Sequence, residues 1–194
     1  MFFGVCSPER EVCVLKLTVR QMLRCALFAA ILCICSPVAV YAGPIPFSLQ
    51  TFAVMLCGTA LPRKEALVSV LVYLLLSLCG LPLFSGGNSG LTAIPGPTGG
   101  YIWSFLLMIP VISLFLSIRV RHGSLEYLTA FAGCLAALLV CYLCGTLQYS
   151  LIAEIGFVQA LSVCVLPFLL SDLIKALAAA GLGTMLRAFL KKQR

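Results

Sequence analysis

Residues 127–147 read YLTAFAGCLAALLVCYLCGTL, a run without a single charged side chain. A helix that crosses a membrane needs about 20 predominantly apolar residues, and lipid offers no hydrogen-bond partner to irregular backbone. The run therefore predicts a membrane-crossing helix. The whole chain has the same character, because 62% of its 194 residues are hydrophobic and 10% are charged. This composition excludes a soluble globular domain, in which about a quarter of the residues are charged, and a disordered chain, which has few apolar residues.

Six apolar segments are predicted to form membrane helices, because proline, glycine and charged residues separate them. Together they predict an all-α membrane protein with one transmembrane domain over residues 1–194 and no room for a soluble catalytic domain. The predicted spans are 22–41, 48–61, 66–82, 101–118, 127–147 and 167–189.

The segment before the last span, residues 157–166, is also apolar. One helix over 157–189 would be about 50 Å long, whereas the hydrocarbon core is about 30 Å thick. We therefore predict a break or kink at Pro167, since proline suits the first turn of a new helix. One long tilted helix is the alternative.

The positive charges lie on one side of this arrangement. When six spans alternate, every one of the 13 Lys and Arg residues except Lys175 falls on the same side. The positive-inside rule then places both termini in the cytoplasm of a multi-pass plasma-membrane protein. The net charge of +7 is thus explained by membrane topology, and nucleic-acid binding is not predicted. A signal peptide cleaved after Val40-Tyr41-Ala42 is the alternative for the first span.

Asp172 and Lys175 are the two charged residues that lie clearly within the membrane, away from the cytoplasmic ends of the predicted spans, and they are three residues apart on one helix face. Charges in hydrocarbon are tolerated when they pair or face a cavity. If the helix enters at Pro167, they lie about 7 to 12 Å deep, level with Gln50 and Tyr101 at the outer ends of their spans. We predict a polar ligand site in the outer half of the membrane. A purely structural salt bridge is the alternative.

The connection over residues 83–100 reads LFSGGNSGLTAIPGPTGG. It is rich in glycine, which permits sharp turns and close approach to a ligand, and it carries no charge. Long connections without secondary structure are often lids or binding loops, so we predict that this one covers the site, with Gly86 and Gly87 among its binding residues. A flexible connector is the alternative.

Several kinds of chemistry are not predicted. The glycine-rich run lacks the Gly-Lys-Ser/Thr ending of a phosphate-binding loop, so the chain has no ATPase of its own. Gly87-Asn88-Ser89-Gly90 resembles a serine-protease element, but the single histidine, His122, lies on the opposite side of the membrane. The 11 cysteines are scattered and lie mainly in apolar spans, where cysteine acts as a small apolar residue. We predict neither an enzyme nor a metal or cofactor site.

Ala26 and Ala30 form a pair of small residues four positions apart in the first span. Such a pair lets another helix approach closely. Packing within the bundle and docking of a partner protein are both compatible with it.

The sequence resembles the BioY family, the biotin-specific S components of energy-coupling factor (ECF) transporters. The resemblance covers residues 22–190 and rests on several motifs in the same order. They are Pro46-Phe47-Ser48-Leu49-Gln50-Thr51, Gly80-Leu81-Pro82, Gly86-Gly87-Asn88, Gly96-Pro97-Thr98-Gly99-Gly100-Tyr101, and Pro167-Phe168 followed by Asp172-Leu173-Ile174-Lys175-Ala176.

The resemblance implies a six-helix ECF S-component bundle that captures biotin with high affinity from the outer side. It implies that Asn88, Asp172 and Lys175 bind the ureido ring, which offers two N–H donors and one carbonyl acceptor, and that Tyr101 and the glycine-rich backbone line the rest. Some family members carry a basic residue where this chain has Ile102, so the partner of the biotin carboxylate is open, with loop N–H groups as a candidate.

The resemblance also implies partners. Ala26 and Ala30 match the motif that docks the transmembrane coupling protein, and two ATPase subunits would supply the energy. A homo-oligomer in membrane lipid is a further arrangement. A self-contained ion-coupled carrier, with Asp172 as its proton site beside Lys175, is the alternative function.

Overall fold

The computed structural model describes residues 17–40, 47–118 and 123–192. The fold is mainly helical, and a short 3-10 helix, η1 (Ser85–Gly87), and a ribbon of two very short antiparallel strands, β1 (Ala39–Val40) and β2 (Phe47–Ser48), complete it. The helices are α1 (Val19–Cys35), α2 (Gln50–Ala60), α3 (Arg63–Leu78), α4 (Gly90–Ala93), α5 (Gly99–Ser117), α6 (Gly123–Ala153), α7 (Phe157–Cys164) and α8 (Leu169–Lys192).

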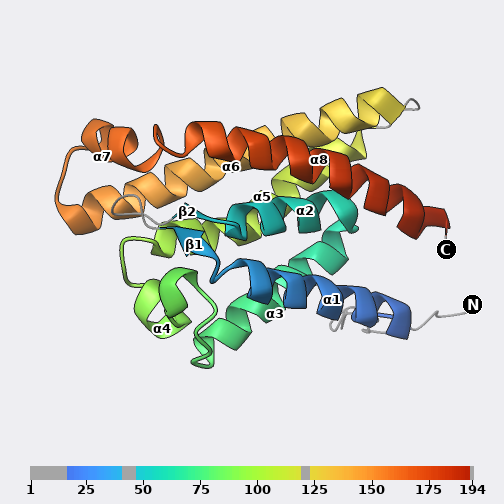
Figure 1. Cartoon of the computed structure of the whole chain (residues 1–194), viewed down its shortest axis with the longest axis horizontal. Coiled ribbons are helices and arrows are strands. Elements are labelled where there is room, and N and C mark those ends of the chain that lie inside the picture. Colours follow the sequence, from blue (N-terminus) through green and yellow to red (C-terminus); the bar gives the residue numbers. More distant parts are fainter. Residues whose placement is uncertain (1–16, 41–46, 119–122, 193–194) are drawn as a thin grey trace, which may run out of the picture.

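The long helices form an elongated bundle in which the start of α1 and the end of α8 lie at the same end (Figure 1). The opposite end, which we call the cap end, is formed by β1, β2, η1, α4 and α7. Three helical segments, Gly99–Ser117, Leu125–Ala153 and Leu169–Lys192, are long and apolar enough to cross a membrane. The helices α1, α2 and α3 are shorter, and α2 measures only about 16 Å at 1.5 Å per residue.

The predicted spans 48–61 and 101–118 agree with α2 and α5 to within two residues. The predicted span 22–41 is wrong at its end, because α1 stops at Cys35. Pro37 has no N–H and its ring clashes with the preceding helical turn. The predicted span 66–82 is displaced toward the C-terminus, because α3 runs from Arg63 to Leu78 and Gly80 follows with φ of +99°.

The predicted span 127–147 is too short, because α6 runs from Gly123 to Ala153 without a proline and ends where Glu154 adopts a φ of +54°. The predicted break near Pro167 is confirmed. The chain turns between α7 and α8, and α8 begins at Leu169, so the alternative of one long helix is excluded.

The connection 83–100 differs from the prediction of a loop without secondary structure. It contains η1, α4 and an isolated bridge between Phe84 and Asn88. Gly90 makes the compact fold possible, because a Cβ there would lie about 3.0 Å from the backbone of Leu78. We call residues 84–98 the cap segment. Several residues on which the sequence-based predictions depend lie outside the described residues, namely residues 1–16, Tyr41, Ala42, Pro46, Arg119, Arg121, His122 and Arg194.

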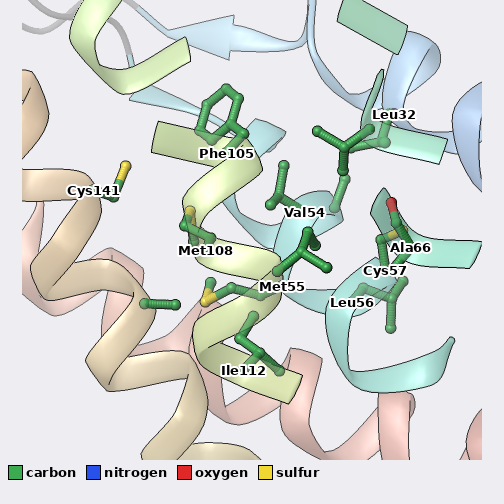
Figure 2. Close-up of a cluster of buried hydrophobic side chains, with 14 of the residues drawn as sticks. Leu32, Val54, Met55, Leu56, Cys57, Ala66, Phe105, Met108, Ile112 and Cys141 are labelled. Atoms are coloured by element: carbon green, nitrogen blue, oxygen red, sulfur yellow. The ribbon is translucent and has the colours of Figure 1, made fainter. Parts of the chain in front are cut away.

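The centre of the bundle is α2, which is buried from Ala53 to Ala60. A helix that is apolar on all sides suits such a position. It packs against α5 and α8, and Thr59 Oγ1 donates a hydrogen bond to the Ala179 carbonyl at 3.1 Å. Figure 2 shows α2 side chains gathered between α5 and α1, with Val54 and Met55 near Phe105, Met108, Ile112 and Leu32.

Candidate ligand-binding site

A cavity of about 260 Å³ lies at the cap end of the bundle, below the cap segment. Its size suits a small organic ligand. It is lined by residues of β2, α2, the cap segment, α5, α6, α7 and α8. These are Ser48, Gln50, Thr51, Phe84, Ser85, Asn88, Thr92, Ala93, Gly96, Pro97, Thr98, Tyr101, Ile102, Phe105, Cys141, Tyr142, Cys164, Phe168, Asp172 and Lys175.

Asp172 and Lys175 lie side by side on the first turns of α8 and both line the cavity. The Lys175 Nζ atom is 2.8 Å from Asp172 Oδ1 and donates a second hydrogen bond, also 2.8 Å, to the Ser48 carbonyl of β2. Thr51 Oγ1 lies 3.4 Å from the same Asp172 oxygen. Asp172 is 4% exposed, and these partners offset the cost of burying a carboxylate. The ion pair therefore adjoins a hollow and is not sealed in the core.

Tyr142 of α6 completes the surroundings of Asp172 and is not among the residues predicted from the sequence. Its hydroxyl donates a 2.7 Å hydrogen bond to Asp172 Oδ2. Both oxygens of the carboxylate thus have protein partners. A tyrosine within an apolar span was the available signal, because a buried tyrosine hydroxyl needs a partner. The sequence does not show which partner it finds.

Gln50 and Tyr101 both line the cavity. The sequence predicted them at the same depth in the membrane as Asp172 and Lys175. Gln50, in the first turn of α2, is 5% exposed and donates through Nε2 to the Tyr73 hydroxyl at 2.7 Å. The Tyr101 ring lies against Gly145 of α6, where a Cβ would come within 2.3 Å of ring atoms. Its hydroxyl oxygen is buried beside Thr146 and Cys164 and makes no hydrogen bond of standard geometry among the described residues.

Asn88 belongs to the cap segment and lines the cavity with an otherwise exposed side chain. Its Nδ2 donates to the Ser85 carbonyl at 3.1 Å. Gly86 and Gly87 belong to η1 between these two residues, and Gly87 is not among the lining residues. The structure therefore brings five of the seven predicted residues to the cavity wall and places these two glycines in the turn that carries Asn88.

The rest of the wall is largely apolar. Phe84, Ile102, Phe105 and Phe168 line the cavity and are themselves buried. Ile102 adds no charge to this wall. Ser171, next to Asp172, uses its hydroxyl to bond the Phe168 carbonyl of its own helix at 2.9 Å.

Ala26 and Ala30 are exposed on α1, together with Leu23 and Leu27. The opposite face of α1 carries the buried residues Phe28 and Leu32. The small pair therefore faces outward and does not pack inside the bundle. In the described part of the chain, no group of three or more His, Cys, Asp and Glu residues is placed to hold a metal ion.

Comparison with known proteins agrees with this architecture. The sequence profile of the BioY family matches residues 9–192. The biotin transporter BioY2 of Lactococcus lactis subsp. cremoris is 36% identical over 83% of this chain and 86% of its own length. The probable biotin transporter BioY of Pyrococcus horikoshii is 36% identical over 84% of this chain and 93% of its own length.

The fold is also similar to that of a solved structure. The crystal structure of the S-component for biotin from an ECF-type ABC transporter matches this fold with a TM-score of 0.76 and 26% sequence identity, over 88% of this chain and 92% of that chain. With the family profile matched over nearly the whole chain and relatives 36% identical, this chain belongs to the BioY family.

Proposed function

We propose that this chain is the high-affinity biotin-binding membrane subunit, the S component, of an ECF-type vitamin uptake transporter. One observation carries the proposal: the Asp172–Lys175 pair stands at the wall of an otherwise mainly apolar cavity, with Tyr142 holding the carboxylate. The names of the relatives and the solved S-component for biotin support this function over a self-contained ion-coupled carrier.

The chemistry of the wall matches the biotin head group. The Asp172 carboxylate accepts an N–H of the ureido ring, while Lys175 donates to the ureido carbonyl or holds Asp172 in place, and Asn88 can donate or accept. Gln50 and the Tyr101 hydroxyl offer two more polar contacts. Ile102, Phe105 and the neighbouring apolar side chains cover the thiophane ring and the aliphatic tail. Backbone N–H groups of the cap segment, residues 84–98, bind the carboxylate.

In this proposal one transmembrane domain crosses the plasma membrane six times, with both termini in the cytoplasm. The arrangement in Figure 1 supports it, because the start of α1 and the end of α8 lie opposite the cap end. Arg24 of α1 contacts Glu65 of α3 at 3.4 Å, and Lys191 of α8 contacts Glu126 of α6 at 3.6 Å. The cations thus gather at one end, as the positive-inside rule requires. The short α2 is surrounded by protein, so its length need not match the hydrocarbon thickness.

The chain carries no energy-coupling machinery in this proposal. The transmembrane coupling protein docks on the Ala26–Ala30 face of α1, which is exposed, and two ATPase subunits drive transport. The chain itself is not an enzyme, and its ligand is biotin without a further cofactor. Assembly as a homo-oligomer is an alternative that co-purification with the coupling protein tests.

The experiment is biotin binding to the purified full chain in lipid nanodiscs, measured by titration calorimetry. We expect Asp172→Asn and Lys175→Ala each to weaken binding by at least about 100-fold, because each leaves a buried charged partner uncompensated. Glu126→Gln is the matched control, since it removes a carboxylate paired with Lys191 away from the cavity. We expect its affinity to equal that of the parent chain.

Competition with unlabelled biotin, biotin amide and other vitamins then tests the ligand. Biotin amide keeps the ureido ring and loses the carboxylate charge, so its affinity measures what the cap segment contributes. Binding that survives in both the Asp172→Asn and the Lys175→Ala chain would show that the site has been placed wrongly. Displacement of biotin by an unrelated vitamin at equal concentration would contradict the ligand.

A further inference from the structure

Tyr73 of α3 is completely buried, with 0% exposure, and does not line the cavity. It is the largest fully buried side chain in the described part of the chain. Its position behind the cavity wall brings it into contact with residues of α1, α2 and the cap segment. A polar group at such depth is costly unless its hydrogen bonds are satisfied, so the partners of its hydroxyl show what it does.

The first partner is Gln50, whose Nε2 donates to the Tyr73 hydroxyl oxygen at 2.7 Å. Gln50 lines the cavity. Because Nε2 is engaged with Tyr73, the atom that Gln50 has left for a ligand is the carbonyl oxygen Oε1. No hydrogen bond to Oε1 is found among residues 17–40, 47–118 and 123–192. A carbonyl oxygen accepts hydrogen bonds and cannot donate them.

The second partner is Ser36, which follows α1 and is also fully buried. The Tyr73 hydroxyl has one proton, and its oxygen already accepts from Gln50. Either hydroxyl could donate in the Ser36–Tyr73 pair, but Ser36 Oγ is the one acceptor that the described residues offer to the buried Tyr73 proton. We therefore assign that proton to Ser36, which gives a chain of donors running from Gln50 through Tyr73 to Ser36. This polarity holds the Gln50 carboxamide in one orientation.

The ring of Tyr73 makes a separate contact with the cap segment. It meets the Phe84 ring edge to face, with centroids 5.6 Å apart and planes at 78°. Phe84 is buried and lines the cavity at the start of the cap segment. One buried side chain thus braces Gln50 at the start of α2 and Phe84 in the cap segment.

We propose that Tyr73 is a positioning residue for ligand binding, which presents the Gln50 carbonyl to an N–H donor of the ligand and holds Phe84 in the cavity wall. This inference rests on the proposed function, because the ureido ring of biotin supplies such a donor. It also assigns a specificity role to Gln50, since the site selects ligands that donate a hydrogen bond at this point and disfavours ligands that present only an acceptor.

The test is a double-mutant cycle with Tyr73→Phe and Gln50→Leu in the full chain, using biotin affinity and ligand-free thermal stability as readouts. Tyr73→Phe keeps the ring contact with Phe84 and removes only the hydroxyl. We expect each single variant to weaken biotin binding by about 10-fold. We expect the double variant to be weakened by about the same factor, because Tyr73 acts through Gln50. Tyr127→Phe, on α6 and outside the lining residues, is the matched control and keeps parental affinity.

Losses that multiply to about 100-fold in the double variant would overturn the inference, because they would show that the two residues act independently. A Tyr73→Phe chain that melts earlier and binds biotin normally would overturn it as well, since its role would then be structural. If that chain does not fold, Ser36→Ala probes the same hydrogen-bond chain, and its effect on affinity must vanish in the Gln50→Leu background. Failure of the parent chain to bind biotin would refute the proposed function itself. If the parent chain binds biotin and the losses of the two single variants multiply in the double variant, only the role of Tyr73 is refuted.

Discussion

At the residue scale, the Asp172 carboxylate is organised before a ligand arrives. Lys175 is 2.8 Å from Oδ1 and the Tyr142 hydroxyl is 2.7 Å from Oδ2. A carboxylate with a donor on each oxygen keeps one orientation and presents its remaining lone pairs to the cavity. Preorganisation of this kind lowers the entropic cost of binding.

Tyr142→Phe therefore has a defined expected effect. It removes the donor to Oδ2 and leaves the Lys175 contact in place. A hydrogen bond to a charged group contributes about 1.5–3 kcal/mol, so biotin affinity should fall by at least about 10-fold in calorimetric titration. An unchanged dissociation constant would mean that the ligand does not use the Asp172 carboxylate in its present orientation.

At the element scale, α6 holds the cap segment through Gln148. Its Nε2 donates to the carbonyls of Ile94 and Gly96, both at 2.9 Å. Gly96 lines the cavity, so these two bonds attach the covering segment to a rigid helix. Gln148→Leu keeps the volume of the side chain and removes both bonds.

We expect Gln148→Leu to increase the dissociation rate of biotin by about 10-fold. Each of the two lost hydrogen bonds contributes about 1 kcal/mol to holding the cap segment on α6, so the cap segment should open more often without them. Stopped-flow or filter-binding chase experiments measure this rate. Gln159→Leu on α7, an exposed glutamine, is the control. Equal dissociation rates in the parent chain and in Gln148→Leu would show that the cap segment does not open through this contact.

The packing of α5 against α6 depends on Gly100. A Cβ at this position would lie 2.3 Å from the Cys144 carbonyl oxygen and 2.9 Å from the Gln148 Cβ. Gly100→Ala must push the start of α5 away from α6 and carry Tyr101 with it. Overpacking of this kind costs about 1–3 kcal/mol, so we expect a lower melting temperature and weaker biotin binding.

Gly181→Ala on α8 is the matched control for Gly100→Ala. A Cβ there meets only the Tyr127 ring at 3.7 Å, an ordinary contact. Alanine is a better helix former than glycine by about 1 kcal/mol, so this variant should melt at the same or a higher temperature. If both variants lower stability equally, the close approach of α5 and α6 is not the cause.

At the scale of the whole molecule, the ligand cavity and the outward face of α1 are separate surfaces. Ala26 and Ala30 are exposed, and neither lines the cavity. Small residues let a partner helix approach closely. If the proposed function holds, Ala26→Leu with Ala30→Leu should therefore leave biotin binding by the isolated chain unchanged and abolish its co-purification with the proposed coupling protein and ATPase subunits.

Ala178→Leu, an exposed alanine on α8, is the control for the α1 variants and should retain the complex. Co-expression followed by affinity purification measures the association, and uptake of labelled biotin by the same cells measures its consequence. Full uptake of biotin by cells that carry the double α1 variant would show that the coupling protein docks on another surface of the chain.

Much of the site was predictable because charged residues are rare inside apolar membrane spans. Asp172 and Lys175 were recognisable as charges inside an apolar span, and Gln50 and Tyr101 as polar residues at the same depth. Gly86 and Gly87 form the turn next to Asn88, and their contact with a ligand stays a prediction. Tyr142 and Tyr73 could not be assigned, because a tyrosine in an apolar helix is equally compatible with a core position.

The sequence by itself determined the membrane class, the approximate positions of the long helices and the break near Pro167. These depend on local properties, namely apolar length, proline and charge placement. Only the tertiary structure decided which faces turn toward the cavity. The helices are apolar on all sides, so no hydrophobic face marks their rotation. Tyr142 meets Asp172 across 30 residues and Tyr73 meets Gln50 across 23, and such contacts arise only when the packing of whole helices brings distant positions together.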